Sequence, residues 1–255
     1  MHFKRFFKFK PNNNSLFIIF NDKKVLFDLE EKTFIFDEAY LNFENYDLEI
    51  IGIAEDEGKN IYAVDITSSN FNYKEQGYKS LIDYDLRFIL TSLSNNEINL
   101  IGRANQLLHW IKSNKYCGYC GSAKKFNDEE QALFCDCNKI MIYPSISPCV
   151  LALIQNGNQI LLARNALFPE GLFSALAGFI EVSETAEETI EREIFEEVRL
   201  KVKNIKYFGS QSWPFPSQLM LAYTCEFDSG EIEVDGQEIV EAKWFDLNNL
   251  PNTPP

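Results

Sequence analysis

The carboxylates between residues 178 and 200 have the types and the spacing needed to bind a metal ion. Glu193 and Glu197 lie four residues apart, and Arg192 and Glu196 repeat this interval. In a helix the interval places each pair on one face, where the two glutamates of the first pair repel each other. A divalent cation would remove this repulsion, because Mg²⁺ and Mn²⁺ prefer carboxylate oxygens and also recruit phosphate oxygens. The pattern therefore predicts metal-assisted chemistry on a phosphorylated substrate.

The same segment resembles the Nudix box, which runs Gly, five residues, Glu, seven residues, Arg-Glu, an aliphatic residue, any residue, Glu-Glu, any residue, Gly and an aliphatic residue. The matching positions are Gly178, Glu184, Arg192, Glu193, Ile194, Glu196, Glu197 and Leu200. Arg199 stands where the family has glycine. A solvated acidic helix is the usual explanation of a charge run, but it does not account for Gly178 and Glu184.

The composition is that of a globular protein, with 255 residues, 45% apolar residues and a net charge of −14. This length is sufficient for one large or two modest domains. No apolar run is long enough to span a bilayer, and the start MHFKRFFKFKPNNN lacks the features of a signal peptide, so we expect a cytoplasmic protein. The negative charge disfavours broad electrostatic binding to nucleic acid, whereas metal ions would reconcile an acidic site with a phosphate substrate.

The elements that position the carboxylates follow from the apolar pattern. Residues 1–112 are expected to form an N-terminal α+β domain without a chemical motif, and residues 113–143 a cysteine-bearing insert. In the first domain we expect a strand near the N-terminus, strands over 15–20, 24–29 and 33–36, and helices over 81–93 and 99–112.

Residues 144–255 are expected to form a third domain. The runs CVLALIQ, QILLARN and SALAGFI predict buried strands, and KYFGSQ, LMLAYTCEF and EAKWFDL predict more strand. A helix is expected over 185–198, begun by a capping box of Thr185 and Glu188. A mixed sheet with the acidic helix packed on it suits the Nudix fold, which is an α/β/α sandwich.

Four of the six cysteines form two close pairs, Cys117 with Cys120 and Cys135 with Cys137. This is near the spacing of a zinc ribbon, in which four thiolates enclose a tetrahedral and structural Zn²⁺. Reduced structural thiols or disulfides are the alternative. The other two cysteines, Cys149 and Cys225, lie in apolar strands and are expected in the core.

The order of strand-rich domain, zinc ribbon and Nudix domain resembles the NADH pyrophosphatase subfamily. That subfamily carries Ser-Gln-Pro-Trp-Pro-Phe-Pro-x-Ser downstream of the box, and residues 210–218 match it with Ser212 in place of a proline and the last serine displaced by one. Trp-Pro-Phe-Pro is a stiff loop that loses little further entropy on binding and can present flat rings to a nucleotide. A proline-rich surface turn with a packed tryptophan is the alternative.

The resemblance implies hydrolysis of the diphosphate in NADH or NAD to AMP and nicotinamide mononucleotide. It also implies removal of NAD caps from RNA 5′ ends, and a homodimer.

The resemblance further implies a role for each matching residue. Glu193, Glu197, Glu238 and the Ala177 carbonyl would hold catalytic Mg²⁺ or Mn²⁺, and Glu196 would be a further ligand or the base. Arg192 would hold the glutamates, and Glu184 would brace Arg192. The residues expected to contact substrate are Tyr143, Phe179, Gln211, Ser212, Trp213, Pro214, Phe215, Pro216, Ser217 and Gln218.

Three departures from the family pattern carry expectations of their own. Arg199 replaces a glycine at which φ is often positive, which costs on the order of 1 kcal/mol and is expected to reduce efficiency rather than abolish it. Asn138 stands where the fourth cysteine is expected. The family continues beyond the end of this sequence into a Ser-Ile-Ala segment and a helix of the substrate pocket, so we expect that part of the pocket to be lacking.

These departures leave three alternatives open. Ser212 and Gln218 change the specificity loop, which would suit a Nudix hydrolase of another nucleoside diphosphate derivative such as ADP-ribose. Arg199 and the short C-terminus would suit a weakly active nucleotide-binding or regulatory protein. A zinc ribbon that binds nucleic acid is the third alternative, but Lys124 and Lys125 are too few to favour it against the acids around them.

Overall fold

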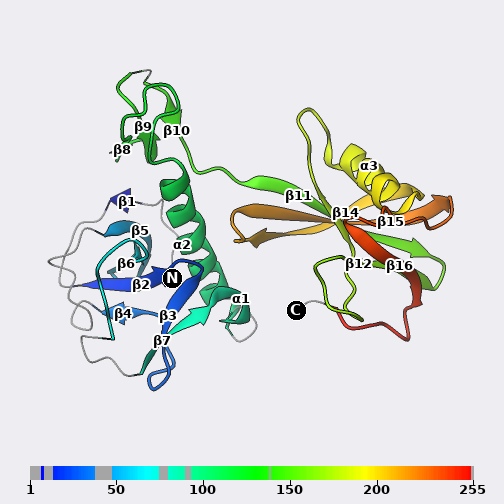
Figure 1. Ribbon diagram of the computed structural model, residues 1–255, viewed down its shortest axis with the longest axis horizontal. Helices are drawn as coiled ribbons and strands as arrows, with labels where there is room; N and C mark the ends of the chain where they lie inside the picture. Colours follow the sequence, from blue (N-terminus) through cyan, green and yellow to red (C-terminus); the bar gives the residue numbers. More distant parts are fainter. Residues whose placement is uncertain are drawn as a thin grey trace. The chain divides into compact units, whose positions relative to one another are not determined.

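A computed structural model of the chain describes residues 7–8, 14–37, 48–74, 80–89, 93–137 and 139–253. The chain divides into two compact units, shown in Figure 1. Unit 1 comprises residues 1–145 together with 214–216, and unit 2 comprises residues 146–213 and 217–255. The predicted boundaries at 112/113 and 143/144 stay a prediction. None of the helices in the described ranges has the length and apolar character needed to cross a membrane.

Unit 1 contains a sheet in the order β1-β5-β6-β2-β3-β7, with β4 beside β2. Its strands are β1 (Phe7–Lys8), β2 (Ser15–Asn21), β3 (Lys24–Asp28), β4 (Phe36–Asp37), β5 (Glu49–Asp56), β6 (Lys59–Asp65) and β7 (Leu81–Asp85). Strands β2 and β6 run parallel, and the other neighbours are antiparallel. Alternation along β2 sends Ile18 and Phe20 into one apolar cluster and Phe17 and Ile19 into another, so the sheet is covered on both faces.

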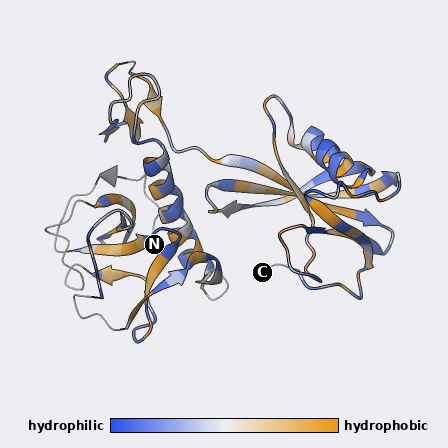
Figure 2. Ribbon diagram, viewed as in Figure 1, coloured by the Kyte–Doolittle hydropathy of each residue, from blue (hydrophilic) through white to orange (hydrophobic). Residues whose placement is uncertain are grey.

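Helix α2 (Asn95–Ser113) covers one face of this sheet, and the short α1 (Leu86–Ile89) precedes it. Ser94 and Glu97 form a capping box, which starts α2 four residues before the expected position. Leu100, Ala104 and Leu107 lie on its buried face, at the spacing that packs a helix on a sheet. In Figure 2 most strands of this sheet are hydrophobic, whereas hydrophilic and hydrophobic residues alternate along α2.

Two expectations for this unit are wrong. Residues 81–85, predicted as helix, form β7, because Leu81 to Asp85 pair in register with Asp28 to Lys24 of β3 and strand pairing overrides helix propensity. The strand expected over 33–36 shortens to β4, and Thr33 makes only a single bridge to Asp28. The N-terminal strand is present as β1, while residues 1–6, 9–13 and 90–92 lie outside the described ranges.

The cysteine-bearing segment of unit 1 forms a small antiparallel sheet. Its strands are β8 (Lys125–Asn127), β9 (Ala132–Phe134) and β10 (Met141–Ile142), in the order β10-β9-β8.

Unit 2 contains a mixed sheet in the order β14-β15-β11-β12-β16, with β13 beside β11. Its strands are β11 (Ser147–Asn156), β12 (Gln159–Asn165), β13 (Leu176–Phe179), β14 (Lys201–Trp213), β15 (Gln218–Ser229) and β16 (Ile239–Asp246). Strands β11 and β15 run parallel, and the other pairs are antiparallel. The expected core positions of Cys149 and Cys225 are confirmed, since both are buried.

Helix α3 (Ala186–Val198) packs on this sheet through Ile190, Ile194 and Val198, which recur every four residues. The expected mixed sheet with an acidic helix is therefore confirmed. Within the described part of unit 2, α3 is the only helix, so a second helical layer of the α/β/α sandwich is not among these residues.

Candidate functional site

The acidic helix has well-defined ends that fix the position of its carboxylates. At its start, the Thr185 hydroxyl accepts from the Glu188 N–H at 3.2 Å, and the Glu188 carboxylate accepts from the Thr185 N–H at 2.8 Å. At its end, Arg199 has φ 59° and ψ 21°, the left-handed conformation that glycine adopts most readily. The expected positive φ is thus confirmed, and the Arg199 N–H still donates to the Phe195 carbonyl at 3.1 Å.

Arg192 connects the carboxylates of the motif to one another. Its Nε and Nη2 donate to the two oxygens of Glu184 at 2.6 and 2.9 Å. Its Nη1 donates to Glu193 at 2.8 Å and to Glu196 at 3.2 Å, and Nη2 also reaches the Phe179 carbonyl at 3.0 Å. Such charge-assisted, bidentate contacts fix orientation as well as charge.

Glu184 is in turn held from the loop and from the helix. Its carboxylate accepts from the Thr189 hydroxyl at 2.9 Å and from the Glu181 N–H at 3.1 Å. The hydrogen bond from Arg192 lowers the pKa of Glu184 to about 2, so the brace is charged at neutral pH. Thr189 is a residue that the sequence did not single out, because a buried threonine inside a helix carries no pattern of its own.

Gly178 leaves room for the Glu193 side chain. A Cβ atom at residue 178 would lie 2.0 Å from Glu193 Cδ, a distance no real side chain tolerates. The first position of the motif is therefore a packing requirement of the carboxylate beside it, and an alanine there would displace Glu193.

Glu197 is a buried carboxylate with an unsatisfied oxygen. The residue is 5% exposed, and its Oε2 has no hydrogen-bond partner. Burial raises its pKa to about 8, with the charges of Glu193 and Glu238 adding to the effect. Burial also raises the pKa of Glu193. An isolated buried carboxylate is costly unless a cation compensates it.

A turn before β16 brings a further carboxylate towards α3. The Asp235 N–H donates to the Glu197 carbonyl at 3.1 Å, and the Asp235 carboxylate accepts from the N–H groups of Glu238 and Ile239 at 3.0 and 2.8 Å. Asp235 was missed in the sequence, although Asp-Gly followed closely by a strand is a recognisable turn signal.

The donor set of this site fits a divalent cation. The unpartnered Glu197 oxygen, the partly neutralised Glu193 and the nearby Glu238 are hard oxygen ligands of the kind that Mg²⁺ and Mn²⁺ prefer. These oxygens are less closely gathered than the cysteine sulfurs, which alone among the described residues form a group within 4.8 Å. Ala177 lies on β13 next to Gly178, at the same edge of the site.

The residues expected to contact substrate are distributed over both units. Phe179 is half exposed on β13, at 49%. Tyr143 belongs to unit 1, where its hydroxyl donates to Glu130 at 2.9 Å. Strand β14 ends with Gln211, Ser212 and Trp213, and β15 begins with Gln218. The turn between them includes Pro214, Phe215 and Pro216, which belong to unit 1.

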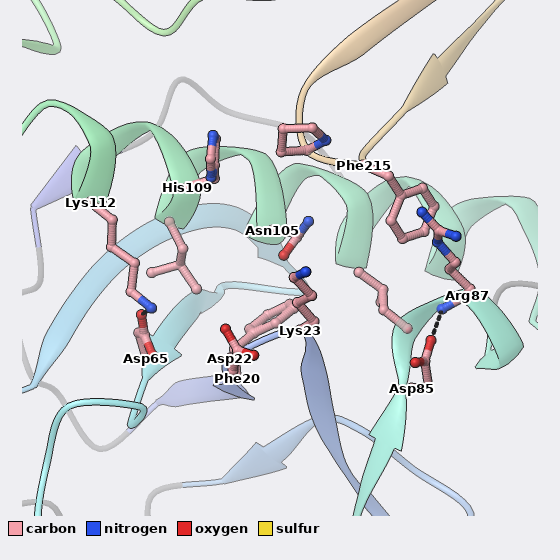
Figure 3. Close-up of a pocket in the computed structure, with 13 residues that line it drawn as sticks. Phe20, Asp22, Lys23, Asp65, Asp85, Arg87, Asn105, His109, Lys112 and Phe215 are labelled. Carbon is pink, nitrogen blue, oxygen red and sulfur yellow. Dashed lines mark hydrogen bonds and ion pairs between the residues drawn. The ribbon is translucent and has the colours of Figure 1, made fainter. Parts of the chain in front are cut away.

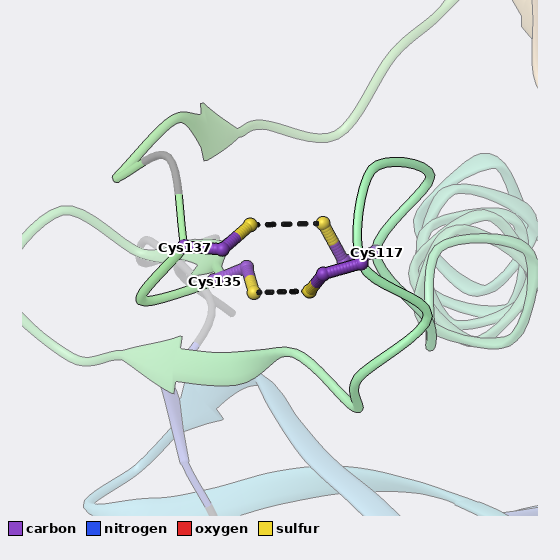
Figure 4. A group of neighbouring side chains, drawn as sticks. Cys117, Cys135 and Cys137 are labelled. Atoms are coloured by element: carbon purple, nitrogen blue, oxygen red, sulfur yellow. Dashed lines mark hydrogen bonds between the residues drawn. The ribbon is translucent and has the colours of Figure 1, made fainter.

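Four cysteines converge in unit 1, as Figure 4 shows. The sulfurs of Cys117 and Cys137 are 3.6 Å apart, and those of Cys120 and Cys135 are 3.5 Å apart. Gly121, with φ 74°, closes the first turn by donating its N–H to the Cys117 carbonyl at 2.9 Å.

The thiols of this cluster differ in the direction in which their pKa is shifted. The Ser122 backbone N–H lowers the pKa of Cys120 to about 6, whereas the neighbouring sulfurs of Cys120 and Cys135 raise the pKa of Cys137. Four sulfurs this close cannot all ionise without a cation, so the geometry is compatible with zinc despite the irregular second pair. Asn138 lies outside the described residues.

Comparison with known proteins finds a domain match and several similar sequences. The family model of the NUDIX domain matches residues 146–255. An NAD-capped RNA hydrolase NudC of Pseudomonas syringae is 43% identical over 61% of this chain and 56% of its own length, and one of Escherichia fergusonii is 41% identical over 69% and 65%. This chain thus spans less than two thirds of the length of either relative.

A solved NUDIX hydrolase from Nitrosomonas europaea is 24% identical, covers 53% of this chain and 80% of its own, and has a TM-score of 0.47. The matched residues, 146–255, include the glutamates of the motif and Arg192, together with the sheet and the helix α3 that hold them. Residues 146–255 therefore match a NUDIX domain, and this match includes the glutamate motif.

Proposed function

We propose that this protein hydrolyses the diphosphate of NADH and NAD, free or at the 5′ end of RNA, to AMP or a 5′-monophosphate end and nicotinamide mononucleotide. The observation that carries the proposal is the buried Glu197 carboxylate, whose free oxygen lies beside the Arg192-bound Glu193. The names of the two relatives, both NAD-capped RNA hydrolases, support the choice of substrate.

In this proposal each residue of the motif has a distinct task. Glu193, Glu197 and Glu238, with the Ala177 carbonyl, hold the divalent cation. When bound, Mg²⁺ or Mn²⁺ neutralises phosphate charge and lowers the pKa of a water. Glu196 is more than half exposed and tied to Arg192, which suits a further ligand or the base that takes the proton of the attacking water.

Water then attacks one phosphorus of the diphosphate, and the bond from that phosphorus to the bridging oxygen breaks. Arg192 keeps Glu193 and Glu196 in a fixed orientation throughout, and Glu184 keeps Arg192 in place. Phe179, Tyr143 and the segment Gln211–Gln218 contact the dinucleotide in this proposal.

The remaining assignments concern the whole protein. We propose that the four cysteines hold a structural Zn²⁺, that the protein is a homodimer and that it acts in the cytoplasm. Light scattering after gel filtration measures the molar mass of the protein in solution. A monomeric mass under conditions of full activity would contradict the dimer.

The first experiment incubates the purified protein with NADH and millimolar Mg²⁺ or Mn²⁺ and follows AMP by chromatography. Glu197→Gln tests the metal site, and Glu191→Gln is the matched control, since Glu191 is an exposed acid of the same helix. We expect AMP from the wild type and from Glu191→Gln, and a loss of at least about a hundredfold in Glu197→Gln.

The same assay with other dinucleotides separates the alternatives. Faster cleavage of ADP-ribose than of NADH would move the assignment to another nucleoside diphosphate derivative. Binding of NADH without any AMP, under either metal, would contradict the enzymatic proposal and favour a nucleotide-binding protein.

A further inference from the structure

The turn between β14 and β15 is held by a helix that is distant in the sequence. Pro214 is buried, and its carbonyl accepts a hydrogen bond from Asn105 Nδ2 of α2 at 2.6 Å. One helical turn earlier, Gly102 is also buried, and a Cβ atom there would lie 3.3 Å from Pro214 Cγ. The glycine thus permits the close approach that the asparagine requires.

Phe215 follows Pro214 and also contacts unit 1. Its ring packs against the apolar cluster around α2, and the Arg87 guanidinium lies 5.2 Å from the ring centroid. The ring and Pro216 line a cavity of about 670 Å³, to which Asn105 and His109 of α2 contribute as well. Figure 3 shows Phe215 beside Arg87, with Asn105 and His109 along the helix.

Two prolines limit the backbone hydrogen bonds that the turn can make. The ladder between β14 and β15 ends with the pair of Trp213 and Gln218. Of the four residues between them, Pro214 and Pro216 have no N–H to donate. Contacts from outside the hairpin add to those within it, and α2 and Arg87 supply them to Pro214 and Phe215.

We infer that Asn105 and Gly102 are positioning residues for the turn Pro214–Pro216 of the proposed substrate loop. The inference rests on the proposed function, in which residues 211–218 contact the substrate. Neither residue belongs to a motif, and both act through Pro214 rather than by touching the reacting atoms.

Asn105→Asp tests the hydrogen bond with an isosteric side chain. The carboxylate cannot donate to the Pro214 carbonyl, and losing one such bond corresponds to about a three- to tenfold rise in KM for NADH with kcat unchanged. Asn99→Asp is the matched control, because Asn99 is exposed on the same helix. Asn105→Gln keeps a donor and is expected to recover part of the affinity.

Gly102→Ala perturbs the same contact from its apolar side. Alanine favours the helix over glycine by about 1 kcal/mol, so the midpoint of thermal unfolding is expected not to fall. The added methyl group pushes Pro214 by a few tenths of an ångström, so KM rises. If this glycine had only a structural role, KM would rise only when the midpoint of thermal unfolding falls.

Hydrogen–deuterium exchange gives a readout that does not need activity. We expect Asn105→Asp to accelerate exchange in the peptide around residues 211–218, while peptides of α3 stay unchanged. Normal exchange and normal KM in both variants would overturn the inference. A wild type without AMP production but with faster loop exchange in Asn105→Asp would contradict only the proposed function.

Discussion

Two side chains of the acidic helix show how crowded charge is handled at the scale of single residues. Arg192 is satisfied by carboxylates on several sides, whereas Glu197 keeps a buried oxygen without a partner. The first arrangement is complete in the protein alone, and the second would be completed by the proposed cation. Stability and metal binding should therefore be linked through Glu197.

Mg²⁺ should stabilise the wild type but not the Glu197→Gln variant. At ten times its dissociation constant, a ligand that binds only the folded state adds about 1.4 kcal/mol to the free energy of unfolding. Without Mg²⁺ the variant should be the more stable protein, because a buried amide costs less than a buried carboxylate. Thermal unfolding with and without Mg²⁺ measures both effects. Equal stabilisation of wild type and variant would place the ion elsewhere.

The brace between Glu184 and Arg192 should depend on pH. Since the folded-state pKa of Glu184 is lowered to about 2 from an ordinary value of 4.5, its contribution is complete above pH 4.5 and is lost as the pH falls towards 2. The difference in stability between wild type and Glu184→Gln should be constant from pH 5 to 8 and shrink below. Urea unfolding at several pH values tests this, and a difference that grows on acidification would be inconsistent with the lowered pKa.

Much of the site could be predicted at this scale, because helical spacing alone places Arg192 near Glu196 and Glu193 near Glu197. Asp235 and Thr189 could not, since they act through single hydrogen bonds to a turn and to another side chain. The clash that requires glycine at residue 178 depends on the three-dimensional approach of β13 and α3. Spacing predicts contacts within one element better than contacts between elements.

At the scale of elements, the end of α3 is under strain. Arg199 adopts a conformation that suits glycine, and its guanidinium only partly compensates through the Phe195 ring, 5.2 Å away. In the same way, residues 81–85 of the helix predicted over 81–93 pair with a neighbouring strand, and only residues 86–89 are helical in the described part of that segment. Local propensity is a weak guide where a partner strand or a helix terminus imposes its own geometry.

Arg199→Gly should stabilise the helix end, and Arg199→Ala separates the cause. The glycine variant removes the left-handed strain, worth about 1 kcal/mol, while the alanine variant keeps it and loses only the guanidinium. We expect Arg199→Gly to exceed Arg199→Ala in urea midpoint by a corresponding amount. Identical midpoints would mean that the strain is absorbed by the chain around it.

The small sheet β8–β10 should depend on the proposed Zn²⁺ for its stability. The protein is expected to carry about one zinc ion per chain, because the four sulfurs lie within 4.8 Å of one another and a structural zinc site takes four such ligands. Cys137→Ser should release the ion, as measured with a colorimetric chelator, and lower the thermal midpoint. Cys225→Ala, at a buried cysteine outside the cluster, should retain it. Retention by Cys137→Ser would leave the fourth ligand unidentified.

At the scale of the whole molecule, the net charge of −14 opposes an RNA substrate. A negative protein repels the phosphates of a transcript at long range, and this repulsion is screened over about 8 Å at physiological ionic strength. A positively charged nucleic-acid binder has the opposite dependence on salt. Of the two proposed substrates, capped RNA would therefore be affected by this charge more than free NAD.

Raising KCl from about 20 to about 150 mM at fixed Mg²⁺ should raise kcat/KM for NAD-capped RNA and leave that for NAD nearly unchanged. The ratio of the two, measured on the same preparation, removes effects of salt on the metal site. A fall in kcat/KM for capped RNA over this range would indicate a basic surface that engages the transcript.

Because residues 214–216 belong to unit 1, this unit cannot be completed until most of unit 2 has been synthesised. The ribosome completes residues 1–145 first, but the last three residues of that unit emerge only after 146–213 have been translated. At roughly 5–20 residues per second, this is a delay of several seconds. During that interval the α2 surface around Gly102 and Asn105 lacks its proline cover and is open to chaperones, so the first unit to be made is also finished late.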